Sequence, residues 1–247
     1  MRTVFWYLRA VFYILLLWMK EPKAKSLLKK GKIKEFDEYV RKILRKFCTT
    51  VIKWAGVKYE VRGLENIPTD RAVVFVSNHQ SNLDPLLLVA ALDKPYAALA
   101  KIELSKLPVV PTWMGFLRCV FVDRDNIRAS VLSMKKSVEV VKSGYSMTVF
   151  PEGTRSGSAE LAEFKAGAYK IAEKAKSDIV PVCINGAYSI MKRGSMKIHG
   201  GNVLVEILPP IRLSEMAKAQ IKQLPETTKQ MIKERIEIYE NEKSSRN

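Results

Sequence analysis

The residues best suited to chemistry lie where apolar runs end, and the first such place holds His79 and Asp84. The apolar run 72–77 leads directly into this segment, and the carboxylate follows the imidazole by five residues. A histidine oriented by a carboxylate can remove a proton from an alcohol near neutral pH, because its ordinary pKa is about 6.5. Asp84 also precedes Pro85, which predicts that it caps the N-terminus of a following helix. This pair is our candidate for general-base chemistry on a hydroxyl group.

A second polar loop, 150–157, also follows an apolar run and reads Phe-Pro-Glu-Gly-Thr-Arg-Ser-Gly. Pro-Glu-Gly-Thr is compatible with an ordinary turn in which the glycine takes a positive φ. Beside a guanidinium, however, the N–H groups of such a loop can bind a phosphate or stabilise an oxyanion. If both apolar runs are parallel strands, the two loops meet at the carboxyl edge of one sheet, where ligands bind in open α/β folds.

The chain from residue 57 onward alternates short β-rich runs with helical patterns. The expected strands are 57–62, 72–77, 96–100, 119–122, 146–150, 179–184 and 203–208. Helical spacing of apolar residues predicts helices over 126–142, 159–176 and about 213–242. This alternation predicts an α/β fold, with a mixed, largely parallel sheet flanked by helices.

The composition describes a folded globular protein with an unusual charge. Of the 247 residues, 47% are hydrophobic and 27% are charged, which excludes a disordered chain and a multi-span membrane protein. The 42 Lys and Arg residues exceed the 25 Asp and Glu residues, and the net charge of +17 indicates a polyanionic partner. Three distant cysteines exclude a disulfide framework, and with only two histidines a zinc or other metal site is not expected.

Residues 1–56 carry 14 Lys and Arg against 4 Asp and Glu. The run 4–19 is apolar and aromatic apart from Arg9, and as a helix of about 24 Å it is short for a hydrocarbon core of about 30 Å. A signal peptide would need a small-residue cleavage site after this run, and none follows. Instead, a lysine-dense segment, 23–34, predicts a turn before a second amphipathic helix over 36–54.

Two interpretations of residues 1–56 remain open. The helices could pack on the main domain as core helices, or they could lie in one leaflet with aromatic rings at headgroup depth and lysines on anionic phosphates. The four aromatic side chains of Trp6, Tyr7, Tyr13 and Trp18 favour the second interpretation. We therefore predict a monotopic membrane anchor in residues 1–56 and a catalytic domain in residues 57–247.

Four sequence blocks, taken in order, resemble those of the glycerolipid acyltransferase family, which includes the 1-acylglycerol-3-phosphate acyltransferases. The segment 78–84 is similar to the family's catalytic NHxxxxD block, and 150–156 reproduces its FPEGTRS block. Residues 101–108 with 120–124 resemble the second block, and 180–184 the fourth. The resemblance covers about residues 57–210. Pro111 and Arg118 stand where the family commonly has glycine, in the middle loop.

The resemblance implies a role for each site residue. His79 would act as general base on the acceptor hydroxyl, and Asp84 would hold its tautomer while the hydroxyl attacks an acyl thioester. The acyl donor would be acyl-carrier protein or coenzyme A, with no covalent enzyme intermediate, metal or further cofactor. The acceptor phosphate would be contacted by Lys101, Arg124, Glu152, Gly153, Thr154 and Arg155. Alternatively, Lys101 is a solvated lysine and Arg124 pairs with a neighbouring aspartate.

The leading hypothesis is acyl transfer to the free sn-2 hydroxyl of 1-acylglycerol 3-phosphate, giving phosphatidic acid in phospholipid biosynthesis. This acceptor is anionic and membrane-resident, so a basic interfacial hairpin would bring the site to it. Glycerol 3-phosphate and other lysophospholipids remain alternative acceptors. Outside enzymes, the alternatives are a non-catalytic membrane protein and a nucleic-acid binder, and neither explains the two catalytic blocks. We expect the protein on the cytoplasmic face of the cell membrane, with an anionic membrane surface as partner and no nucleic acid.

Overall fold

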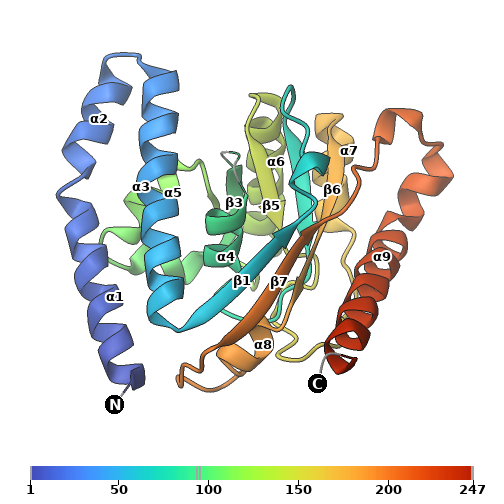
Figure 1. The fold of residues 1–247 in the computed structure, drawn as a ribbon. Helices are drawn as coiled ribbons and strands as arrows, with labels where there is room; N and C mark the ends of the chain where they lie inside the picture. Colours follow the sequence, from blue (N-terminus) through green and yellow to red (C-terminus); the bar gives the residue numbers. More distant parts are fainter. Residues whose placement is uncertain (1, 93, 95, 246–247) are drawn as a thin grey trace.

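A seven-stranded sheet forms the centre of the computed structural model, which describes residues 2–92, 94 and 96–245 (Figure 1). The strand order is β1-β7-β6-β2-β5-β3-β4, and every neighbouring pair is parallel except β6 and β7. The strands are β1 (Val57–Arg62), β2 (Val73–Ser77), β3 (Tyr96–Lys101), β4 (Val120–Val122), β5 (Ser146–Val149), β6 (Asp178–Asn185) and β7 (Gly201–Ile207). The predicted α/β class and its mixed, largely parallel sheet are confirmed.

The central strands β2 and β6 are buried along their whole length, because helices cover both faces of the sheet. Alternate side chains of β2 enter different cores: Val73 and Phe75 pack into one hydrophobic cluster, and Val74 and Val76 into the other. This two-sided burial explains why the strand is read in the sequence as a continuous apolar run.

Two sets of helices form the outer layers (Figure 1). The helices α3 (Ile33–Trp54) and α4 (Asp84–Ala91) pack on one face, and α6 (Ile127–Lys142), α7 (Gly167–Ala175) and α9 (Lys218–Ser244) on the other. The short helices α5 (Val110–Phe116) and α8 (Ala187–Ile190) lie in connections, as do the 3-10 turns Leu64–Asn66, Ile102–Lys106 and Leu213–Glu215.

The helix predicted over 159–176 is wrong in its first half, since α7 begins only at Gly167. Residues 159–166 form a loop whose backbone is bound elsewhere: Ala162 N–H donates to the Glu152 carboxylate, and Lys165 N–H to the Pro151 carbonyl. Phe164 is nevertheless buried in the core. Phe164 matched the helical spacing of apolar residues because it is buried, although it lies in a loop. The final helix begins at Lys218, after a separate 3-10 turn, and continues through Ser244.

The N-terminal segment also differs from prediction in its turn. After α1 (Arg2–Trp18) the chain forms another helix, α2 (Glu21–Lys29), through much of the predicted lysine-rich turn. Pro22 allows this because it lies in the first turn of α2, where no intrahelical N–H donor is required. The chain reverses direction only in the short turn between α2 and α3, where Gly31 has a φ of +68°.

The core-helix interpretation describes part of residues 1–56. The second half of α3 is an ordinary core helix, with Val51 and Ile52 buried against the sheet. Helix α1 packs on α3 through one face, where Trp6 Nε1 donates to the Val51 carbonyl at 3.0 Å. Its other face is apolar and exposed, and comprises Val4, Phe5, Leu8, Val11, Phe12, Leu15, Leu16, Trp18 and, just beyond the helix, Met19.

Candidate active site

The His79–Asp84 pair is formed where β2 ends. His79 Nδ1 lies 2.7 Å from Asp84 Oδ2, and the same oxygen accepts hydrogen bonds from the N–H groups of Gln80 at 2.6 Å and Ser81 at 2.7 Å. A carboxylate oxygen is an acceptor toward all three groups, so Nδ1 must donate a proton to it. The neutral ring therefore carries its proton on Nδ1 and keeps the lone pair on Nε2. Asp84 is fully buried, and the His79 side chain is 15% exposed.

Asp84 does not cap α4, so that expectation is wrong. It is the first residue of the helix, with Leu83 at the N-cap position, and no side-chain cap bond is formed there. Its carboxylate points back to the turn 79–81 instead. Its position in the first helical turn still places the negative charge at the favourable end of the helix dipole. The contacts hold the carboxylate rigidly beneath the imidazole.

The turn that carries His79 is attached to the end of β6. The buried Asn78 amide donates to the Ile184 carbonyl and accepts from the Ile184 N–H, both at 2.8 Å. Gln80 Oε1 accepts from the Ala187 N–H at 3.1 Å. Sequence analysis included Asn78 in the NHxxxxD block but assigned no role to Asn78 or Gln80. Their position beside His79 was the available signal, since buried amides must find partners.

The second polar loop lies against the same histidine. The ring of Phe150 stacks on the His79 ring, with centroids 4.2 Å apart and an interplanar angle of 21°. Glu152 Oε1 accepts from the His79 N–H at 2.7 Å, and its Oε2 accepts from the Ala162 N–H at 3.1 Å. Burial raises the pKa of Glu152, although the two N–H donors partly offset this. The carboxylate faces inward, so only the Glu152 backbone is left for the predicted phosphate contact.

Cationic side chains surround Gly153 in this loop. The Arg124 guanidinium donates to the Gly153 carbonyl, so Arg124 lies at the loop. Lys165 Nζ lies 3.2 Å from the point where a Cβ on Gly153 would be, and Gly153 has a φ of +69°. Thr154 is exposed and Arg155 is half-buried. Arg124 and Lys165 thus provide positive charge beside one glycine turn, and Arg155 follows two residues further along the chain.

Lys165 was missed as a site residue, and Lys101 is placed less closely than expected. Lys165 lies in the stretch 159–176 that was predicted to be a helix, so the sequence did not place it at the glycine turn. Lys101 ends β3, which pairs with β5, so it lies at the same edge of the sheet. Its ammonium, however, is 2.6 Å from the Glu103 carboxylate, and its side chain is 59% exposed.

The described residues include no group of three or more His, Cys, Asp or Glu placed to hold a metal ion. Burial raises the pKa of Cys48 to about 12 and of Cys119 to about 11, which keeps these thiols protonated at neutral pH. Cys183 is buried as well, and its pKa is also raised. The candidate group for proton transfer at this edge is the His79 imidazole, whose Nε2 keeps its lone pair.

Comparison with known proteins identifies the family of the chain. The family model described as acyltransferase matches residues 58–185, a stretch that runs from β1 to the end of β6 and contains both polar loops. The chain therefore belongs to the acyltransferase family.

The similar proteins carry more specific names. A probable 1-acyl-sn-glycerol-3-phosphate acyltransferase of Mycoplasma pneumoniae is 41% identical over 146 residues, covering 56% of this chain and 53% of the relative. The 1-acyl-sn-glycerol-3-phosphate acyltransferase of Borreliella burgdorferi is 29% identical over 196 residues, covering 79% of this chain and 78% of the relative. The match thus spans about half the length of the first relative.

A solved structure is similar over almost the whole chain. The crystal structure of the 1-acyl-sn-glycerophosphate (LPA) acyltransferase PlsC from Thermotoga maritima has a TM-score of 0.86 and 29% identity. The match covers 97% of this chain and 95% of that one, so it includes the N-terminal helices.

Proposed function

We propose that this protein transfers a fatty acyl group from an acyl thioester to the free sn-2 hydroxyl of 1-acylglycerol 3-phosphate, giving phosphatidic acid. The observation that carries this proposal is the oriented His79–Asp84 pair beside a cation-lined glycine turn. Relatives named for this acceptor, and the similar solved structure, support the choice.

The proposed chemistry uses the free nitrogen of His79. Nε2 removes the proton of the acceptor hydroxyl as its oxygen attacks the thioester carbonyl. The new C–O bond forms, the C–S bond breaks, and the proton passes from the imidazolium to the departing thiolate. Asp84 stabilises the imidazolium through Nδ1, as in other histidine–carboxylate pairs. Stacking on Phe150 limits rotation of the ring during these steps.

The cations around Gly153 are proposed to hold the acceptor phosphate. Guanidinium and ammonium groups form strong, charge-assisted hydrogen bonds with phosphate oxygens. Arg124, Arg155 and Lys165, together with Thr154 and the loop backbone, would fix the phosphate so that the sn-2 hydroxyl meets His79. Such positioning supplies much of the rate in a transfer between two bound substrates. Lys101 stays a further candidate from the neighbouring strand.

The exposed face of α1 is proposed to enter one leaflet of the cell membrane. Within the described residues, the bent segment Arg2–Lys29 is the one helical stretch long and apolar enough to cross a membrane, and only 17% of its apolar window is buried. Its inner face is held to α3, where Tyr13 packs edge-on against Phe47 with ring centroids 5.1 Å apart. Crossing the bilayer would detach α1 from α3, whereas lying in a leaflet preserves the contact. This supports a monotopic placement.

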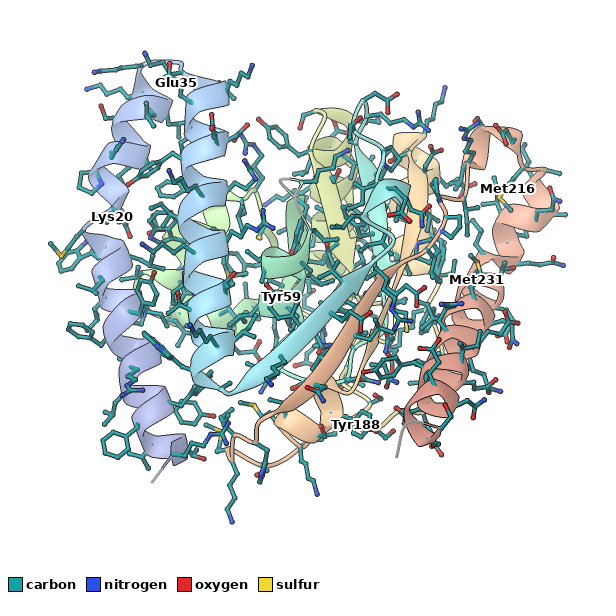
Figure 2. All side chains as sticks on the ribbon, in the orientation of Figure 1. Lys20, Glu35, Tyr59, Tyr188, Met216 and Met231 are labelled. Atoms are coloured by element: carbon teal, nitrogen blue, oxygen red, sulfur yellow. The ribbon has the colours of Figure 1, made fainter. Side chains whose placement is uncertain are left out.

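The cytoplasmic face is proposed because acyl thioesters are made there and because lysines favour its anionic lipids. Residues 20–34 supply those lysines at the end of α1 and through α2. Lys20 lies at the junction of α1 and α2 in Figure 2.

The test is acyl transfer by the purified full chain in detergent, with 1-acylglycerol 3-phosphate and glycerol 3-phosphate as parallel acceptors. Acyl-carrier protein and coenzyme A thioesters are compared as donors, with His79→Ala as control. We expect turnover with the lysophospholipid acceptor and its loss in the variant. Turnover with glycerol 3-phosphate alone would overturn the proposed acceptor. No turnover with either acceptor would overturn the proposed activity.

A further inference from the structure

One loop joins the N-terminal helix to the active-site edge. Residues 191–200, here called the bridging loop, connect α8 to β7 and lie beside the N-terminal end of α1 (Figure 1). The Ile198 N–H donates to Thr3 Oγ1 at 3.2 Å, and the Tyr7 hydroxyl lies 3.8 Å from Met196 Sδ. The loop therefore borders the apolar helix directly. Tyr188 marks α8 at this edge in Figure 2, and Glu35 the opposite end of the hairpin.

The other side of the bridging loop contacts both polar loops of the site. The Met191 carbonyl accepts from Ser81 Oγ at 3.4 Å, and Met191 Sδ lies 3.4 Å from Asn82 Nδ2. Arg193 packs over Gly157, because a Cβ on that glycine would lie 2.7 Å from the arginine Cβ. The bridging loop thus occupies the space between α1 and the loops that carry His79 and the glycine turn.

The exposed residues of this loop have the chemistry of a lipid interface. Lys192, Arg193 and Lys197 are exposed, and Met196 is 66% exposed among them. No Asp or Glu occurs anywhere in residues 186–205. Cations bind headgroup phosphates of an anionic leaflet, while an exposed apolar side chain enters the interface between them.

We propose that the bridging loop is a second membrane contact, which holds the mouth of the active site against an anionic leaflet. This inference rests on the proposed leaflet placement of α1. The exposed face of α1 fixes how the protein is turned about the helix axis, but a single helix leaves the protein free to tilt along that axis. A basic contact beside the N-terminal end of the helix limits this tilt and holds the His79 edge of the sheet at the membrane. The acceptor would then reach the site from the leaflet without crossing bulk water.

The position of the loop is tested with single cysteines that carry a polarity-sensitive fluorophore. Met196→Cys reports the loop, Leu8→Cys reports α1, and Lys218→Cys on α9 is the solvent control, with labelled wild type as the blank. Vesicles of phosphatidylcholine with phosphatidylglycerol are added to the full chain. We expect blue shifts at residues 196 and 8 and none at 218. A shift at residue 8 alone would overturn this inference and leave the helix anchor standing, whereas no shift at either would overturn both.

The charges are tested by partition between water and the same vesicles. The loop variant Lys192→Ser/Arg193→Ser/Lys197→Ser is expected to bind roughly 10- to 100-fold more weakly, since each cation near an anionic surface contributes several-fold. A matched variant that removes three exposed lysines elsewhere is expected to lose less than about threefold, because distant charges are screened. Its substitutions are Lys174→Ser, Lys218→Ser and Lys222→Ser. If both variants lost the same vesicle affinity, the effect would be due to net charge alone, and the proposed contact of the bridging loop would be wrong.

Discussion

The carboxylate of Glu152 accepts a hydrogen bond of 2.7 Å from the backbone N–H of His79. A side chain of the loop after β5 thereby holds the main chain of the loop after β2, and its second oxygen holds Ala162 of the following loop. Glu152 is 2% exposed, so its contribution is to the position of His79 and not to solvent-facing chemistry. The two sequence blocks of the family are in this way parts of one rigid assembly.

Replacing Glu152 tests this positioning role. Glu152→Ala removes both acceptors, and we expect kcat to fall about 10- to 100-fold with little change in the acceptor KM, since small displacements of a catalytic base cost that much. Glu152→Gln keeps one acceptor oxygen and is expected to fall between the alanine variant and wild type. Steady-state kinetics provide the measurement, with the exposed neighbour changed as Glu163→Ala for control. A raised acceptor KM at unchanged kcat would instead indicate phosphate binding.

The same carboxyl group predicts a pH dependence of stability. Burial raises the pKa of Glu152 in the folded protein, so the folded state binds this proton more tightly than the unfolded state does. Its contribution to the free energy of unfolding is therefore greatest below the ordinary glutamate pKa, and is lost as pH rises through the folded pKa. Relative to Glu152→Gln, wild type should gain stability between about pH 7 and about pH 4 in urea denaturation. If the stability of wild type relative to Glu152→Gln stayed constant or fell on acidification, this prediction would be contradicted.

Changes to the His79–Asp84 pair should affect the chemical step. His79→Ala is expected to lower kcat by about a hundredfold to ten-thousandfold, because general-base catalysis is lost. Asp84→Asn keeps an amide oxygen for the N–H groups of Gln80 and Ser81 and for Nδ1, but it removes the negative charge that stabilises the imidazolium, so a smaller loss than in His79→Ala is expected. Single-turnover rates at saturating substrates measure the effect, with circular dichroism to verify the fold. Near-wild-type turnover in His79→Ala would disprove the proposed base.

The cations around Gly153 should set acceptor affinity. Arg124→Gln and Lys165→Gln each remove a charged donor, and we expect the KM for the lysophospholipid acceptor to rise about tenfold to a hundredfold. The KM for the acyl thioester should change much less in both variants. Lys142→Gln at the end of α6 serves as the charge-matched control. If both substrates were affected equally, these cations would not be specific to the acceptor phosphate.

Arg118 combines strain with a contact to the N-terminal helices. Its φ of +60° lies in the region that favours glycine, while its guanidinium is 2.8 Å from Asp37 of α3 and 2.6 Å from the Tyr145 hydroxyl. Arg118→Gly loses the contacts but relieves the backbone, whereas Arg118→Ala loses the contacts and keeps the strain. We therefore expect the glycine variant to be about 1 kcal/mol more stable than the alanine variant in chemical denaturation. The reverse order would show that the turn is unstrained.

Much of the fold was predictable because its signals are local. All seven strands occur within two residues of their predicted ends, since β-rich runs between polar turns depend on near neighbours in the chain. Helix α6 was equally clear from its apolar spacing. The prediction was wrong where an apolar residue was buried by the rest of the protein, as at Phe164, whose loop backbone bonds to a distant segment.

The features of the site also fall into those predictable from local sequence and those that depend on the tertiary structure. The sequence by itself determined the His79–Asp84 spacing, the glycine turn at 153 and the apolar character of α1, because each is a short run of residues with its own chemistry. Only the tertiary structure decided that the Glu152 carboxylate faces inward to the His79 backbone, that Lys165 lies over Gly153, and that residues 191–200 join α1 to the site. Those relationships depend on segments that are distant in sequence and meet only when strands pair and helices pack. Local propensity cannot encode them, because their energies arise only from burial and hydrogen bonding in the assembled fold.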